Sequence, residues 1–87
     1  MDKLTQIRNE INAVSVAYKR IPTTAELVKN GWDINDALKY NLESNKIANK
    51  IQNAIFAVIF GDLNAASLYI KDAFEKAAEM LNTLIRY

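Results

Sequence analysis

Asp72, Glu75 and Glu79 form the tidiest set of carboxylates in the sequence, because their spacing places all three on one side of a helix. Carboxylates gathered in this way could hold a metal ion or act as a general acid and base. Lys71 and Lys76, however, alternate with them at the spacing of ion pairs on a helix surface. We therefore interpret the segment as a charged, solvated helix face and predict no catalytic or metal site there.

The residue types that carry most enzyme chemistry are missing from the chain. It contains no histidine and no cysteine, which excludes a nucleophile–histidine pair and the ordinary ligand sets of zinc and di-iron sites. Its two glycines, Gly31 and Gly61, cannot form a phosphate-binding loop. The sequence predicts a non-enzymatic protein with no catalytic, cofactor-binding or metal-binding residues.

The charge balance argues against a polyanionic or membrane partner. Eleven basic and ten acidic residues give a net charge of +1, so no strong overall field attracts nucleic acid or anionic lipid. The longest uncharged stretch, residues 51–61, is far shorter than the roughly 20 residues that span a bilayer. No signal peptide is visible, and the absence of cysteine fits a reducing compartment. We expect a cytoplasmic protein with no membrane attachment.

Apolar periodicity and turn residues predict an all-α chain that forms one domain over residues 1–87. The expected helices span about residues 2–19, 24–30, 34–60 and 62–86. Pro22 ends the first helix, because the residue before a proline is pushed out of the α region. Thr23 and Glu26 have the spacing of a capping box at the start of the short second helix, and Gly31 ends that helix. The expected fold is a small helical bundle.

The two long helices should form an antiparallel αα-hairpin, because only Gly61 and Asp62 separate them. Asp33 or Asn35 should cap the first of these helices. The second carries an apolar stripe at spacings of three and four: Leu63, Ala66, Ile70, Ala73, Phe74, Ala77, Leu81, Leu84 and Ile85. Its alanines allow the helix axes to approach closely. Trp32 is expected to be a core anchor that folds back onto the short helix.

One stretch of the third predicted helix, from Ala54 to Phe60, is apolar on every side. A helix with one face in water carries polar residues on that face, so something else should cover the second side of this stretch. On a helical wheel, the side suited to the fourth helix holds Ile47, Ile51, Ala54 and Val58, and the opposite side holds Leu38, Leu42, Phe56 and Phe60. The second set could pack on the N-terminal helix, on another copy of the chain, or on both. The candidate oligomer interface is Leu38, Leu42, Ile55, Phe56, Ile59 and Phe60.

A stripe of asparagines follows the same side of this helix. Its members, spaced by four residues, are Asn41, Asn45, Asn49 and Asn53. Asparagine is a mediocre helix former, so helix propensity does not explain the stripe. It could be a solvated face in a protein from an AT-rich genome, or a polar layer that determines the register of a helical oligomer. A third interpretation is contact with nucleic acid, together with Lys39, Lys46 and Lys50.

The hypothesis that these patterns favour is a non-enzymatic helical protein–protein interaction module that self-associates, with a dimer preferred to other oligomers. An unidentified protein partner is compatible with the same surface. The alternative is a small nucleic-acid-associated regulator, although Glu26 and Asn30 fall where a helix-turn-helix buries apolar side chains. The small size and the abundance of asparagine, lysine and isoleucine also fit a protein encoded by a phage or mobile element.

Overall fold

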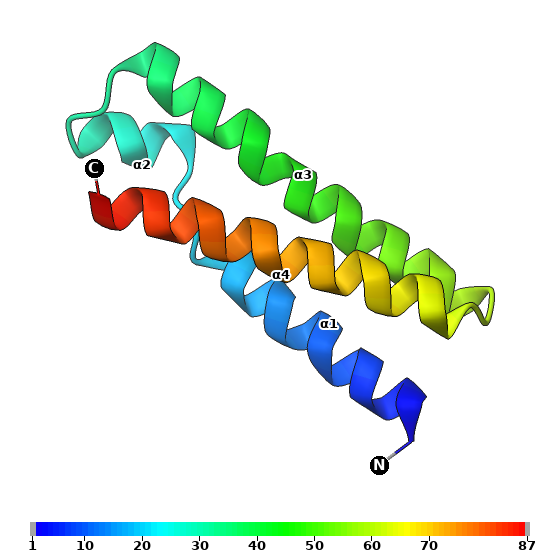
Figure 1. Cartoon of the computed structure of the whole chain (residues 1–87). Coiled ribbons are helices and arrows are strands. Elements are labelled where there is room, and N and C mark those ends of the chain that lie inside the picture. The colour runs from blue at the N-terminus through cyan, green and yellow to red at the C-terminus, as the bar shows by residue number, and fades with distance from the viewer. Residues whose placement is uncertain (1, 87) are drawn as a thin grey trace.

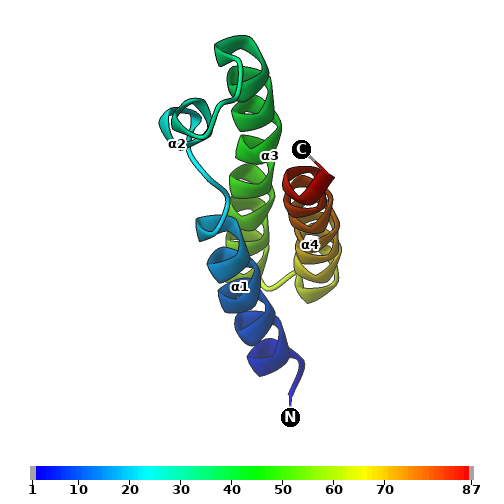
Figure 2. The ribbon, with the colours of Figure 1, turned by 90° about the vertical axis from the view of Figure 1, so that its left-hand side faces the viewer.

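The computed structural model describes residues 2–86, with side chains as far as residue 84, and every regular element in that range is a helix. The elements in chain order are α1 (Lys3–Lys19), α2 (Thr24–Lys29), α3 (Ile34–Ile59) and α4 (Leu63–Arg86). The long helices α3 and α4 form the antiparallel hairpin, and α1 contacts both of them (Figure 1). The short helix α2 packs on α3 (Figure 2). The predicted all-α bundle is confirmed, within an elongated shape of 45 × 20 × 15 Å.

Side-chain caps explain where the helices begin. The hydroxyl of Thr23 accepts a hydrogen bond from the Glu26 amide at 3.2 Å, and the Glu26 carboxylate accepts one from the Thr23 amide at 3.5 Å. This is the predicted capping box, which satisfies two backbone donors that lack helical partners. Asp33 caps α3 by accepting from the Asn35 amide at 3.0 Å, so Asp33 and not Asn35 is the N-cap.

The turn between α3 and α4 depends on Gly61. Its φ of +80° lies in the left-handed region, a backbone conformation that is strained for residues with a side chain. This conformation lets the Asp62 amide donate to the Ala57 carbonyl at 2.8 Å, which closes the end of α3. The Asp62 carboxylate then accepts from the Ala65 amide at 3.0 Å at the start of α4. The chain reverses within three residues, as the predicted hairpin requires.

The core lies between α1, α3 and α4 and divides into two clusters. The cluster towards the open end of the hairpin contains Val14, Leu27, Ala37, Tyr40, Ile47, Ala73, Ala77 and Met80. The cluster near the α3–α4 turn contains Ile7, Ala54, Ala57, Ala66 and Ile70. The six alanines in these clusters lie on α3 and α4, three on each helix, and their small side chains let the hairpin pack closely. The predicted inner side of α3 is confirmed at Ile47 and Ala54, both fully buried.

The buried members of the predicted α4 stripe include Ala66, Ile70, Ala73 and Ala77. Phe74 is 37% exposed, so this member of the predicted stripe is only partly covered. Its neighbour Ala73 is fully buried in the core cluster that also contains Val14 of α1 and Ile47 of α3. Ile85 lies outside the residues whose side chains are described. Trp32 is half-buried and packs on the core, with its ring edge-on to Tyr40 at 5.3 Å.

No helix within residues 2–86 combines the length and the hydropathy needed to cross a bilayer.

Candidate interaction surface on α3

One side of α3 points away from α4, and no other helix covers it (Figure 1). We call this side the outer face. It consists of Ile34, Leu38, Leu42, Asn45, Asn49, Gln52, Asn53, Phe56, Ile59 and Phe60, of which Phe60 is the residue that caps the helix. All ten side chains are exposed. The outer face therefore unites most of the predicted interface with three of the four predicted asparagines.

The apolar members of the outer face are exposed to an unusual degree. Leu42 is 67% exposed, Ile59 is 68% exposed and Phe60 is 82% exposed. Leu38 and Phe56 are each about half exposed, at 48% and 49%. Single exposed apolar residues are normal on protein surfaces, but a row of them along one helix is typical of a contact site.

Of the alternatives for this side of α3, cover by the N-terminal helix α1 is wrong. Ile7 and Val14 of α1 are fully buried in the groove between α3 and α4, within core clusters that contain residues of both helices. Packing in that groove removes more apolar surface from water than packing on α3 alone, because two helices then cover each side chain. Phe56 and Phe60 therefore receive no cover from α1.

Charge is segregated around α3. Its five charged residues are Asp36, Lys39, Glu43, Lys46 and Lys50. At 3.6 residues per turn, all five fall within an arc of about 80° on the flank towards α4. The outer face and the residues within its arc, which spans about 120°, are uncharged. Charged side chains are depleted in the centres of protein interfaces, so this distribution favours a contact surface over an ordinary solvated face.

The lysines proposed as nucleic-acid contacts lie on the charged flank, beside carboxylates. Lys46 pairs with Glu43 at 3.0 Å, and Lys50 of α3 pairs with Asp72 of α4 at 3.6 Å. Lys76 of α4 also donates to Glu43, at 2.8 Å. The hydrogen bonds from Lys76 and Lys46 hold the pKa of Glu43 below its ordinary value, and the bond to Glu43 raises the pKa of Lys76. Two of the three predicted lysines, Lys46 and Lys50, are therefore in ion pairs.

Two of the three predicted carboxylates of α4, Asp72 and Glu79, also form ion pairs. Asp72 pairs with Lys50, and Glu79 pairs with Lys76 at 3.5 Å, at the predicted spacing along one helix. The two ion pairs between helices, Glu43 with Lys76 and Asp72 with Lys50, were not predicted. The spacing of residues along one helix does not reveal which neighbouring helix a side chain faces. In the described part of the chain, no cluster of three or more potential metal ligands is present.

The asparagine stripe divides into two parts. Asn41 is half-buried, and its amide donates to the Pro22 carbonyl at 3.4 Å, so it belongs to the packing of the α1–α2 connection. The Asn45 side-chain carbonyl accepts from the Tyr18 hydroxyl of α1 at 3.4 Å, at the edge of the outer face. Asn49 and Asn53 are exposed near the middle of the face. Only Asn45, Asn49 and Asn53 are placed to meet a partner.

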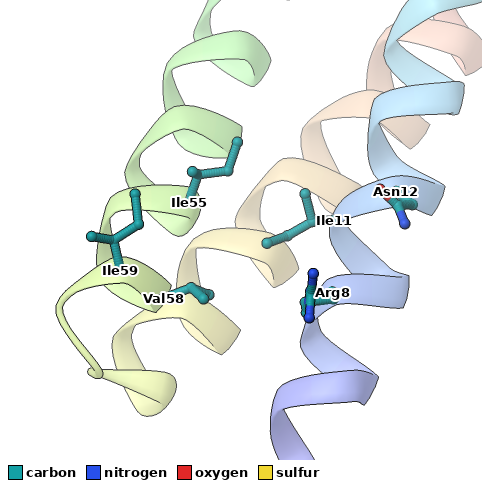
Figure 3. A pocket seen from close by; sticks show the side chains of 6 residues that line it. All are labelled: Arg8, Ile11, Asn12, Ile55, Val58 and Ile59. Carbon is teal, nitrogen blue, oxygen red and sulfur yellow. The ribbon is translucent and has the colours of Figure 1, made fainter.

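A shallow groove of about 270 Å³ adjoins the outer face at the turn end of the hairpin. Figure 3 shows Ile55, Val58 and Ile59 of α3 on one side of it and Arg8, Ile11 and Asn12 of α1 on the other. The predicted interface residue Ile55 lies in this groove, half-buried, and not on the outer face. Ile59 borders both, so the apolar surface continues from the outer face into the groove.

One apolar member of the outer face, Ile34, is 51% exposed and was not among the predicted interface residues. Its spacing of four residues from Leu38 could have revealed it. Fold and surface together define a small helical bundle with one long, uncharged, unpartnered helix face. Comparisons with protein-family models, curated proteins and solved structures gave no match.

Proposed function

We propose that this chain is a non-enzymatic interaction module that self-associates, as a dimer, through the outer face of α3. The observation that carries the proposal is the row of exposed large apolar residues on a helix face without charge. Burial of such residues against a partner removes their apolar surface from water, which is the main favourable contribution to most protein association.

A second copy of the chain is the partner that the charge distribution favours. Faces that meet across a two-fold axis present the same groups to each other, so any charge near the axis would meet its own like charge. The outer face carries none, because the charges of α3 lie on the flank towards α4. A short chain also buries a modest share of its surface alone, and association adds to its core.

The nucleic-acid alternative is less favoured, because Lys46 and Lys50 are paired with carboxylates. Binding through several phosphates weakens steeply as salt concentration rises. We expect no retention of DNA or RNA at low salt. We place the module in the cytoplasm, in keeping with its lack of cysteine, and its small size and composition are compatible with a phage or mobile element.

The solution mass tests self-association directly. Light scattering behind size-exclusion chromatography, repeated over a range of protein concentrations, should give a mass near twice the 9.8 kDa of one chain. The elongated shape affects elution volume but not scattering mass, so scattering is the measurement to use. A mass of one chain at high micromolar concentration would contradict the proposal.

A further inference from the structure

Seven of the ten residues of the outer face are spaced symmetrically about Asn49, whereas Ile34, Gln52 and Ile59 lie outside this arrangement. The seven are separated by four, three, four, four, three and four positions, an order that is the same from either end. They are Leu38, Leu42, Asn45, Asn49, Asn53, Phe56 and Phe60. The polarity of the residues follows the same symmetry. Two large apolar residues lie at each end, leucines at one and phenylalanines at the other, and three asparagines lie between them. All seven are exposed.

Such a face complements itself when two copies lie antiparallel. Leu38 of one copy then lies at the level of Phe60 of the second, and Leu42 lies at the level of Phe56 of the second. Asn45 lies at the level of Asn53 in the same way, and Asn49 meets its own equivalent on the axis. We propose that two chains associate through antiparallel α3 helices, with the two-fold axis passing at Asn49. This arrangement rests on the proposed self-association and specifies its geometry.

Side-chain size favours antiparallel over parallel pairing. In the antiparallel pair, each outer layer contains one leucine and one phenylalanine, so all four apolar layers have similar volume. In a parallel pair, Leu38 and Leu42 would meet leucines while Phe56 and Phe60 would meet phenylalanines. The separation of packed helices depends on the side chains between them, so the two axes would splay towards the phenylalanine end. Opposed helix dipoles also favour the antiparallel arrangement.

The asparagines give the pair a single register. Asn45 already accepts from the Tyr18 hydroxyl, which leaves its amide nitrogen to donate to Asn53 of the second copy. The apolar layers on both sides limit the access of water to these amides, where hydrogen bonds are stronger. A slip of one helical turn would place asparagine against leucine or phenylalanine and leave amide groups without partners. A polar residue within an apolar helix interface determines register in this way.

Introduced cysteines test this geometry, and because the chain has no cysteine of its own, any cross-link must come from the introduced residues. Asn49→Cys should cross-link to its equivalent through a short bis-maleimide, since both lie at the axis. Leu38→Cys alone should not cross-link. In the antiparallel pair, Leu38 of the second chain lies 22 residues along the helix from Leu38 of the first, which is roughly 33 Å at 1.5 Å per residue. A mixture of Leu38→Cys and Phe60→Cys chains should form a cross-linked heterodimer. Each variant is first checked for helix content and scattering mass.

The outcomes separate the geometry from self-association. Cross-linking at Asn49→Cys and in the mixture, but not in Leu38→Cys alone, is the expected result. A dimeric mass with cross-linking of Leu38→Cys alone would show parallel pairing and overturn the geometry while retaining self-association. A dimeric mass without any of these cross-links would place the interface elsewhere and would also overturn it. A monomeric unsubstituted chain would remove both proposals.

A spin label provides a second measurement if the cysteines at Leu38 or Phe60 weaken association. Lys39 lies beside the outer face, and its replacement by a labelled cysteine removes no apolar side chain from that face. The antiparallel pair places the two labels roughly 30 Å apart along the axis, from 20 residues at 1.5 Å each. A single short distance between the labels, as expected for parallel helices, would refute the geometry.

Discussion

The hydroxyl of Tyr40 on α3 donates a hydrogen bond of 2.8 Å to the main-chain carbonyl oxygen of Met80 on α4. Both residues are buried, and the ring of Trp32 lies edge-on to Tyr40. The bond joins the two long helices near the open end of the hairpin, and Gly61 joins them at the other end. α3 is thus held at both ends on its inner side, which leaves its outer face available as an extended rigid surface.

Loss of the Tyr40 hydroxyl should destabilise the fold modestly. Tyr40→Phe removes one buried hydrogen bond while keeping the ring, so we expect the free energy of unfolding to fall by about 1 kcal/mol. Urea denaturation at one fixed protein concentration measures this, because association contributes to apparent stability. Tyr69→Phe is the matched control, since Tyr69 is 37% exposed on α4. Equal losses in the two variants would contradict a specific role for the Tyr40–Met80 bond.

Alkaline pH should weaken the fold through the same residue. Burial raises the pKa of Tyr40 above its ordinary value of 10.0. The folded state therefore holds this proton more tightly than the unfolded state, so the stabilisation is complete below about pH 10 and declines as pH rises through the folded pKa. Melting temperatures measured from neutral to alkaline pH should decline less steeply for Tyr40→Phe than for the unsubstituted chain. Identical declines would show that Tyr40 contributes nothing to the alkaline response.

An acidic residue on the outer face should separate the subunits. Leu42→Asp places a carboxylate from each chain in an apolar layer of the proposed interface, and the cost of desolvating it should reduce the scattering mass to that of one chain. Leu68→Asp is a closely matched control, because Leu42 is 67% exposed on α3 and Leu68 is 65% exposed on α4. Helix content measured by circular dichroism should remain the same in both. If both variants stay dimeric, or both dissociate, the outer face is not the specific interface.

Replacement of Gly61 at the hairpin turn should lower the free energy of unfolding through backbone strain alone. Gly61 has a φ of +80°, and a Cβ built there meets no atom within 4 Å. Gly61→Ala should therefore lower the free energy of unfolding by roughly 1 kcal/mol from left-handed strain, without a packing clash. Gly61→Asn should lose less, because asparagine tolerates this conformation better. Thermal unfolding of the two variants at matched concentration distinguishes them, and an alanine variant as stable as the parent would disprove the strain.

The helix boundaries could be predicted from the sequence because they depend on neighbouring residues. The capping box of Thr23 and Glu26 and the left-handed turn at Gly61 are local hydrogen-bond and steric requirements, and both occur where predicted. The apolar residues opposite the core side of α3 could also be identified, since the period of a helix determines which residues share a side. Leu42 and Phe60 were assigned to that side from periodicity alone.

Only the tertiary structure decided which neighbour each side receives. The sequence left α1 free to cover Phe56 and Phe60, and the structure instead buries Ile7 and Val14 in the groove between α3 and α4. The pairing of Lys50 with Asp72 could not be predicted either, because it depends on how α3 and α4 are rotated about their own axes relative to each other. Periodicity specifies the direction of a side chain from its own helix axis. The competition among all helices for apolar contact determines what that side chain meets.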